Sequence, residues 1–232
     1  MDARKYPSTL HLPFSPGTTS DDRIARDVSA LTGGAPVVVT EKLDGENTCL
    51  NRFGVFARSH AAPTRNPWAS YLWDLWRTHK SDLGDLEVFG ESLYAVHSIT
   101  YTGLTDYFYV FAVRDGGRWL AWEEVVLYAR LLNLPTVPEL FTGTIRPDEL
   151  EPLVSRLVAE PSRLSEPEIG LSEREGVVLR VARTFGDDEF ARVVFKWVRR
   201  GHVQTTAHWT RNWQRARRAW ELHALLRPEE KT

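Results

Sequence analysis

The sequence predicts an α+β fold in which mainly antiparallel sheets are flanked by helices. Short apolar and β-branched runs alternate with turn residues such as Asp44-Gly45 and Gly186-Asp187-Asp188, a pattern typical of antiparallel hairpins. Segments with helical spacing are few, and they do not alternate regularly with the strands as they would in a parallel α/β sheet. The chain has 232 residues, of which 42% are hydrophobic, and this is enough for a sizeable core.

The predicted strands are runs of apolar residues that turn residues interrupt. Before the first strand, three prolines within the first sixteen residues predict an irregular arm. A short helix over 21–31 follows the arm and ends at Gly33-Gly34. The strands are expected, in chain order, at 37–41, 48–52, 54–58, 86–91, 107–114, 175–182 and 191–198, the last two forming a hairpin.

Four further segments have helical spacing, at 66–80, 123–132, 147–159 and 206–226, and a polar loop is expected at 161–172. Tryptophans at such spacing are more often core residues than ligand contacts, and we interpret them as core. The last helix would have two faces, one of them rich in arginine. Its apolar face would bury against the sheets through Trp209, Trp213, Ala216 and Trp220.

Charge is distributed unevenly along the chain, although the formal net charge is only −2. Between Lys196 and Trp220 there is no Asp or Glu, while several arginines fall there. Such an asymmetry is typical of a phosphate-binding surface, with a merely solvated helix face as the alternative. The arginines are Arg199, Arg200, Arg211, Arg215, Arg217 and Arg218.

Cysteine content and hydropathy indicate the compartment. Cys49 is the only cysteine, which excludes an internal disulfide and fits a reducing environment. The first residues lack the apolar core of a signal peptide, and no later stretch reaches the length of a membrane span. We therefore expect a cytoplasmic protein with no membrane partner.

Lys42 follows the apolar run 36–39 and is followed two residues later by Asp44 and then by Gly45. A strand would fix such a lysine against a rigid sheet, while Gly45 permits a tight turn that keeps the Asp44 carboxylate within reach of a metal. These are the requirements of an enzyme that forms a covalent bond to a nucleotide. The alternative is an ordinary strand followed by a hairpin turn, since short motifs of this kind occur by chance.

Charged residues interrupt four other apolar strands near their ends. Arg58 and Glu91 end two of the strands, Glu175 begins a third, and Lys196 lies near the end of a fourth. Each alone could simply meet water at a strand end. Together with Lys42 they supply a nucleophile, carboxylates for a divalent cation and positive charge for a triphosphate.

Six short segments occur in a fixed order along the chain, namely Lys42-Leu43-Asp44-Gly45, Arg58-Ser59, Phe89-Gly90-Glu91, Tyr109-Val110-Phe111, Glu175-Gly176-Val177-Val178 and Phe195-Lys196. This series resembles the signature motifs of the covalent nucleotidyltransferase superfamily, which comprises ATP-dependent RNA and DNA ligases and mRNA capping enzymes. Within it, the chain most resembles the RNA ligases, particularly small bacterial and phage members. Glu41, Asn47 and the stretches 91–98 and 198–205 support that narrower assignment.

The resemblance implies a covalent reaction at Lys42. The neutral amine would attack the α-phosphate of ATP and form lysyl-AMP, with release of pyrophosphate. A lysine with a pKa near 10.4 is almost wholly protonated at pH 7, a deficit of about 4 to 5 kcal/mol. We expect a bound metal, Lys196, Arg58 and partial burial to lower this pKa. The catalytic residues implied are Lys42, Lys196, Glu175 and Arg58, with Lys196 contacting the α-phosphate.

The resemblance also implies the cofactors, ATP and Mg²⁺ or Mn²⁺. The adenine would lie between Phe111 and Val178, and Glu41 or its backbone would contact the amino group, with a solvent-facing Glu41 as the alternative. The ATP-binding residues implied are Glu41, Lys42, Arg58, Glu91, Phe111, Val178 and Lys196. The metal would be held, largely through its waters, by Asp44, Glu91, Glu175 and Asn47, the last with a turn residue as its alternative.

RNA ends are the implied partners. Ligases of this kind move AMP to a 5′-phosphate end and then join that end to a 3′-hydroxyl, and RNA repair with an end-healing kinase or phosphatase is the expected setting. Arg58 would engage the 5′-phosphate or the ribose. The nucleic-acid backbone would contact Arg199, Arg200, Arg211, Arg215 and Arg218. A ligase of DNA or mixed ends is one alternative, and a non-catalytic nucleic-acid-binding module of the same fold is another.

The resemblance divides the chain into an adenylyltransferase domain over 1–200 and a short helical extension over 201–232. Roughly thirty residues cannot form the five-stranded OB-fold that DNA ligases and capping enzymes append, so no OB-fold is expected. Two positions depart from the family pattern. Many relatives carry a lysine where this chain has Val198 and an acidic residue where it has Ala112.

Overall fold

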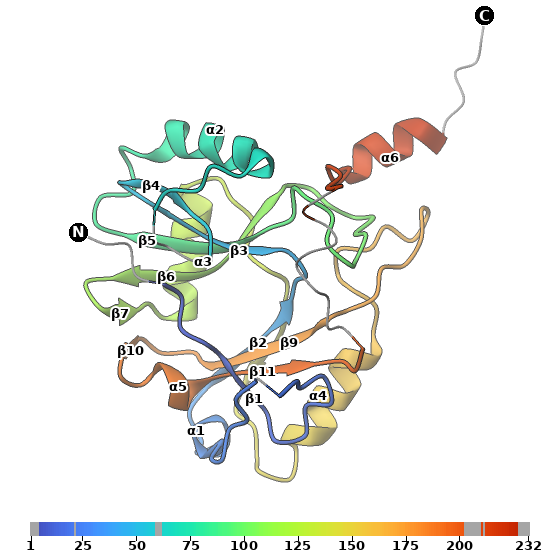
Figure 1. Ribbon diagram of the computed structural model, residues 1–232. Coiled ribbons are helices and arrows are strands. Elements are labelled where there is room, and N and C mark those ends of the chain that lie inside the picture. The colour runs from blue at the N-terminus through green and yellow to red at the C-terminus, as the bar shows by residue number, and fades with distance from the viewer. Residues whose placement is uncertain (1–4, 21, 59–61, 202–209, 211, 227–232) are drawn as a thin grey trace, which may run out of the picture.

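Two β-sheets, one above the other, form the body of the protein (Figure 1). The computed structural model describes residues 5–20, 22–58, 62–201, 210 and 212–226. A five-stranded sheet lies below a six-stranded sheet in this view, and helices pack around both. The architecture confirms the predicted α+β class with mainly antiparallel sheets.

The five-stranded sheet has the strand order β1-β11-β9-β2-β8. Its neighbours are antiparallel except β1 and β11, which run parallel. The amino-terminal arm therefore adds an edge strand beside β11, the strand that carries Lys196. The strands are β1 (Leu10–His11), β2 (Val37–Lys42), β8 (Glu139–Gly143), β9 (Gly176–Val181) and β11 (Val194–Val198).

The six-stranded sheet has the order β10-β7-β6-β5-β3-β4, and all its neighbours are antiparallel. The register places Glu91 between Asn47 and Tyr109, so residues of two predicted motifs lie beside Asn47 on neighbouring strands. The strands are β3 (Glu46–Asn51), β4 (Gly54–Phe56), β5 (Glu87–Ser92), β6 (Phe108–Asp115), β7 (Arg118–Trp119) and β10 (Phe185–Gly186).

The helices lie outside the sheets, with α2 and α3 beside the upper sheet and α4 against the lower one (Figure 1). No helix in the described part of the chain has the length and apolarity that crossing a bilayer requires. The helices are α1 (Ser29–Thr32), α2 (Ser70–His79), which a 3₁₀ turn η1 (Pro67–Ala69) precedes, α3 (Trp122–Leu131), α4 (Leu150–Ala159), α5 (Phe190–Val193) and α6 (Ala219–Leu226).

The structure differs from the sequence prediction mainly at sheet edges. The helix predicted over 21–31 is only the short α1, and the arm predicted to be irregular contains β1. The strands β7, β8 and β10 were not predicted, and β7 and β10, with two residues each, are too short to show alternation. The predicted hairpin partners β9 and β11 do pair antiparallel, but β10 and α5 lie between them along the chain.

The helix predicted over 206–226 is the largest difference. Among the described residues of this segment, only α6 is helical, whereas 206–209 and 211 lie outside the described residues. Residues before α6 are extended and pair with the loop after β5, through bonds from Val96 N to Gln214 O and from Ala216 N to Tyr94 O. These backbone bonds outweigh the helical spacing of the tryptophans.

Strand β2 shows how the five-stranded sheet divides its residues between two sides. Val37 and Val39 pack into the core beneath α4, whereas Val38 belongs to the core of the six-stranded sheet. Thr40 and Lys42 continue the side of Val38, because side chains alternate along a strand. They line a cavity between the two sheets.

Candidate active site

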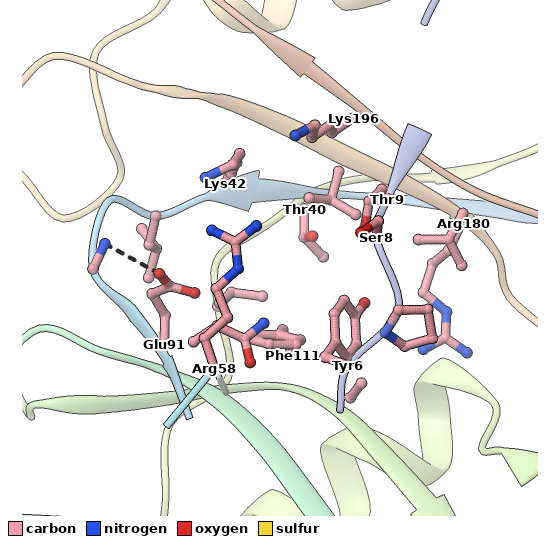
Figure 2. Close-up of a pocket in the computed structure, with 18 of the residues that line it drawn as sticks. Tyr6, Ser8, Thr9, Thr40, Lys42, Arg58, Glu91, Phe111, Arg180 and Lys196 are labelled. Atoms are coloured by element: carbon pink, nitrogen blue, oxygen red, sulfur yellow. Dashed lines mark hydrogen bonds between the residues drawn. The ribbon is translucent and has the colours of Figure 1, made fainter. Parts of the chain in front are cut away.

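A cavity of about 550 Å³ lies between the two sheets. One end is charged and the other is aromatic, and both sheets and the amino-terminal arm contribute walls (Figure 2). The structure brings Lys42, Arg58, Glu91, Phe111 and Lys196 to this cavity from five different strands or loops. Asp44, Asn47, Glu175 and Val178 also line it.

Lys42 lies at the end of β2 and points into the cavity (Figure 2). Its Nζ lies 2.6 Å from Glu175 Oε1, and the side chains are 26% and 6% exposed, so this ion pair is mostly shielded from water. Gly176 is the register partner of Lys42, and a Cβ there would lie 2.0 Å from the carbonyl oxygen of Trp197. Glycine thus permits the close strand packing that brings Glu175 against the lysine.

Glu91 faces the same ammonium group from the six-stranded sheet. Its Oε1 accepts a hydrogen bond of 3.1 Å from the backbone N of Gly45, drawn as the dashed line in Figure 2. A Cβ at Gly45 would lie 2.4 Å from the Ser92 carbonyl oxygen, so the turn after Lys42 requires glycine. Burial raises the pKa of Glu91 to about 8, and the nearby Glu175 adds to this rise.

The carboxylates determine the protonation of Lys42. Burial by itself lowers the pKa of Lys42, but Glu175, Glu91 and Asp44 outweigh burial, and the net direction is upward. Burial therefore acts in the expected direction, and the contribution of a bound metal, Lys196 and Arg58 to a lower pKa stays a prediction. Lys42 is held as an ammonium ion until something neutralises the carboxylates.

Asp44 and Asn47 flank the turn after Lys42 in different ways. Asp44 Oδ2 accepts hydrogen bonds from the backbone N and the hydroxyl of Ser98 and from the backbone N of Ile99, at 2.5–2.9 Å. This carboxylate therefore fixes the loop after β5 as well as adding negative charge. Asn47 Oδ1 is buried and accepts no hydrogen bond within the described part of the chain, so it is an oxygen donor without a partner there.

Lys196 reaches the cavity from β11, where it pairs in register with Val178. Its Nζ lies 3.4 Å from Asp22 Oδ1, and both side chains are about one quarter exposed (22% and 26%). Burial lowers the pKa of Lys196, and Asp22 partly offsets this effect. Sequence reasoning found Lys196 but missed Asp22, because no local pattern marks a carboxylate 174 positions away.

The aromatic end of the cavity contains Phe111 from the upper sheet and Val178 from the lower one. Tyr6 from the arm packs edge-on against Phe111, with 5.1 Å between ring centroids, and Figure 2 shows the two rings beside each other. Tyr6 also contacts Phe89, Trp119 and Phe190 at 5.1–5.4 Å. A single tyrosine in a proline-containing arm carries no sequence signal of this role.

The Glu41 side chain is directed elsewhere. It is fully buried, 3.4 Å from Arg174 Nε, and Oε2 accepts a hydrogen bond of 2.9 Å from the backbone N of Arg163. Alternation along β2 puts it on the opposite side from Lys42. Neither predicted environment of this side chain, solvent or a bound adenine, matches the structure, and only the Glu41 backbone remains to contact a ligand in the cavity.

Arg58 follows β4 and is exposed, and its guanidinium extends into the cavity toward Lys42 (Figure 2). It forms no ion pair with the described residues. Arg58 is thus an uncompensated cation at the charged end of the cavity, as the sequence analysis expected of a phosphate contact.

The arginines predicted to form a nucleic-acid surface have different environments. Arg199 pairs with Glu173, and Arg215 pairs with Glu221 at 2.5 Å. Arg218 stacks over the rings of Tyr107 and Trp220, at 5.0 and 5.8 Å. Arg200 is exposed and forms no ion pair within the described residues, and Arg211 lies outside them. Acidic residues outside the run between Lys196 and Trp220 therefore neutralise part of the basic stretch.

The model of the RNA ligase family matches residues 35–198, which is more than half of the chain. The chain belongs to the RNA ligase family. The matched region of this RNA ligase family member contains Lys42, Glu91, Glu175 and Lys196, but neither Tyr6 nor Asp22. The comparison with curated proteins finds no match.

Solved structures with the same fold include an archaeal ATP-dependent RNA ligase (TM-score 0.54, 16% identity, 85% of this chain and 48% of that chain). They also include a variant of the Naegleria gruberi RNA ligase with ATP and Mn (TM-score 0.56, 19% identity, 85% of this chain and 61% of that chain). A putative ATP-dependent DNA ligase from Aquifex aeolicus is similar too (TM-score 0.51, 20% identity, 84% of this chain and 50% of that chain). This RNA ligase family member spans about half to three fifths of their length.

Proposed function

We propose that this RNA ligase family member is an ATP-dependent RNA ligase that seals 5′-phosphate and 3′-hydroxyl ends through lysyl-AMP on Lys42. One observation carries the proposal. Lys42 Nζ lies in a cavity between two sheets, 2.6 Å from a buried carboxylate and in a cluster of opposite charges. A lysine that only stabilised the fold would not require a cavity of this size beside it. The membership of the family agrees with this chemistry.

The first step forms a bond between Lys42 Nζ and the α-phosphorus of ATP, and it breaks the bond from that phosphorus to the pyrophosphate leaving group. Lys42 must lose a proton before it attacks. Glu175 Oε1 lies close enough to Lys42 Nζ to accept this proton. The negative charge that develops on the α-phosphate would be stabilised by Lys196 from β11 and by Arg58.

The residues around Lys42 fit a divalent cation shared with the triphosphate. They include the oxygen donors that this cation prefers: the carboxylates of Glu91 and Glu175 and the amide oxygen of Asn47, which lacks a hydrogen-bond partner among the described residues. In the described ranges no three His, Cys, Asp or Glu side chains could hold a metal alone, which agrees with one or two carboxylates plus phosphates as the Mg²⁺ ligands. When bound, Mg²⁺ or Mn²⁺ supplies positive charge that offsets the carboxylates.

The base would occupy the aromatic end. Phe111 and Val178 come from opposite sheets and would contact the two faces of an adenine, while the Glu41 backbone would contact its edge. Tyr6 lies against Phe111 and would form a side wall of this slot. We assign the amino-terminal arm to the nucleotide site for this reason.

The second part of the reaction concerns the nucleic acid. AMP would pass from Lys42 to a 5′-phosphate near Arg58, and a 3′-hydroxyl would then displace it. RNA repair in the cytoplasm, with an end-healing kinase or phosphatase upstream, is the setting we propose, and the division into 1–200 and 201–232 belongs to the same proposal. Among the arginines predicted to contact nucleic acid, Arg200 is best suited to a phosphate contact, because it is exposed and forms no ion pair with the described residues.

Incubation with Mg²⁺ and ATP labelled at the α-phosphate tests the proposal. We expect label on the protein in a denaturing gel, none from γ-labelled ATP, and none in Lys42→Ala. A lack of covalent label from both ATP and GTP would instead support a non-catalytic nucleic-acid-binding module. Preformed lysyl-AMP enzyme mixed with 5′-phosphorylated RNA, DNA and mixed ends, nicked or single-stranded, then distinguishes an RNA ligase from a DNA ligase.

A further inference from the structure

The segment that precedes β2 reaches the cavity beside Lys196. β1 pairs with β11 so that His11 is opposite Lys196, and Leu12 N donates a bond of 2.8 Å to the Lys196 carbonyl. The chain then turns and returns alongside β1, where His11 N bonds to Arg23 O and Ala25 N bonds to His11 O. This return brings Asp22 to the wall of the cavity.

Both carboxylate oxygens of Asp22 are engaged. Oδ2 accepts hydrogen bonds of 3.0 Å from the backbone N and the hydroxyl of Thr19. Oδ1 lies 3.1 Å from Nε2 of the buried His11 and 3.4 Å from Nζ of Lys196. His11 is held in turn by Ser15, whose Oγ lies 2.9 Å from Nδ1. The carboxylate is therefore fixed by its own segment before it meets the lysine.

Lys196 has no other carboxylate partner among the described residues, because its one ion pair there is with Asp22. A lysine side chain is flexible, and a fixed partner restricts where its ammonium group lies. The distance of 3.4 Å exceeds the 2.7–2.9 Å of a strong charge-assisted hydrogen bond. A phosphate oxygen could thus displace Asp22 without breaking a short bond.

We propose that Asp22 is a positioning residue for Lys196: it holds the ammonium at the cavity wall, and the nucleotide phosphates take over this contact when they bind. The inference rests on the proposed function, because it needs a phosphate near Lys196. Asp22 lies outside residues 35–198, the region that defines family membership. The alternative is that Asp22 only fastens the amino-terminal segment in place. It predicts a lower free energy of unfolding for a variant, with no effect on lysyl-AMP formation that depends on Lys196.

The test compares Asp22→Asn with Asp27→Asn. Asp27 is an exposed carboxylate of the same segment that accepts a bond from Ser29 N at 2.8 Å and does not line the cavity. We expect the rate of lysyl-AMP formation at saturating ATP to fall about tenfold in Asp22→Asn, with KM for ATP changed less than about twofold. Asp27→Asn should match the wild type.

A double-mutant cycle separates positioning from fastening. In a Lys196→Ala background, Asp22→Asn should cause no further loss of rate, because the residue through which it acts is gone. An additional tenfold loss in that background, or an unchanged rate in Asp22→Asn alone, overturns the inference while leaving the proposed function intact. If Asp22→Asn folds poorly, Thr19→Ala removes one of the bonds that fix the carboxylate and should lower the rate by roughly threefold.

A measurement without catalysis tests the contact between Asp22 and Lys196 by itself, whether or not the wild type forms lysyl-AMP. Lysines are methylated with ¹³C, and the Lys196 signal is assigned from Lys196→Arg. The groups that face Lys196 are Asp22, Lys42, His11 and Glu175. Removing the Asp22 carboxylate should lower the pKa of Lys196, since this carboxylate raises it. An unchanged pKa overturns the contact.

Discussion

The amino-terminal and carboxy-terminal segments differ in what they contribute to the site. The first segment enters the space between the sheets, where Tyr6 packs on Phe111 and Asp22 contacts Lys196. The last segment packs against the loop after β5 through Trp213 and then projects away as α6 (Figure 1). The amino-terminal segment therefore reaches the site, whereas the arginine-rich end is partly neutralised within the fold.

This difference shows that whether an arginine can bind a phosphate depends on the ion pairs that it forms within the fold. Arg215 belongs to a run without acidic residues, but Glu221 from α6 meets it. Arg58 and Arg200 form no ion pair with described residues, and their charge remains available to a phosphate. An electrostatic surface inferred from sequence alone overestimates the cations that a ligand can use.

The largest effect should come from Tyr6→Ala in the arm. The substitution removes a ring that touches four aromatic neighbours, so we expect a loss of about 3 kcal/mol in the free energy of unfolding and at least a roughly tenfold increase in KM for ATP. Urea unfolding and an ATP titration of lysyl-AMP formation measure the two. Tyr6→Phe, which keeps the ring, is the control. An unchanged KM in Tyr6→Ala would remove the arm from the nucleotide site.

Trp213→Ala should have a different effect at the other end. Its indole ring lies 6.3 Å from the Trp68 ring and 6.0 Å from the Tyr94 ring, so we expect a loss of about 2 kcal/mol in unfolding free energy. Lysyl-AMP formation should stay within about twofold of the wild type, because Trp213 does not line the cavity. A loss of adenylylation larger than the loss of folded protein would show that the last segment also supports the site.

Arg200→Ala and Arg215→Ala distinguish unpaired from paired arginines. We expect Arg200→Ala to weaken RNA binding and to reduce the slope of log affinity against log salt by about one. Arg215→Ala should instead lower stability by about 1 kcal/mol, since it removes the ion pair with Glu221, and should leave the salt slope unchanged. Filter binding at several salt concentrations measures both, and equal slopes for the two variants would contradict the distinction.

Acid titration should give the smallest effect. Burial raises the pKa of Asp22, but the hydrogen bonds from Thr19 outweigh burial and lower this pKa to about 2. The bond from Arg215 lowers the pKa of Glu221 to about 2. A carboxyl whose pKa is lower in the folded than in the unfolded protein stabilises the fold at any pH above its unfolded pKa. This contribution is therefore present above about pH 5 and is lost as the pH falls through 4 toward 2.

In Asp22→Asn and in Glu221→Gln, the decrease in unfolding free energy between neutral and acid pH should in each case be smaller by on the order of 1 kcal/mol, a figure reduced by solvent screening. Stability curves between pH 2 and pH 7, a range set by these two carboxyls, measure the effect. Only Asp22→Asn should also slow lysyl-AMP formation at neutral pH. Equal adenylylation defects in the two variants would erase the functional difference between the segments.

The sequence was sufficient for the fold class and for the residues at strand ends. Lys42, Glu175 and Lys196 interrupt apolar strands, and antiparallel pairing of β2, β9 and β11 brings those strand ends together. A charged residue that interrupts an apolar run can be recognised from the sequence alone. The strand containing Phe111 could be predicted for the same reason, as a dense aromatic and β-branched run.

Features that depend on contacts distant in sequence could not be predicted. Asp22 is significant only because β1 pairs with β11, and a two-residue strand leaves no alternation to detect. Glu41 precedes the lysine, yet its environment is determined by Arg174, far along the chain. The helical spacing of Trp213 was misleading, since the backbone bonds of Gln214 and Ala216 to the loop after β5 make the residues before α6 extended.

The location of AMP on the protein tests the central claim most directly. The chain has five lysines, and Lys5, Lys42 and Lys196 all line the cavity. After incubation with ATP and Mg²⁺, peptide mass spectrometry should find the adenylyl group on Lys42 alone, with none on Lys196, and Lys42→Arg should abolish it. An adduct on Lys5 or Lys196, or one that survives in Lys42→Arg, would contradict the assignment of Lys42 as the nucleophile.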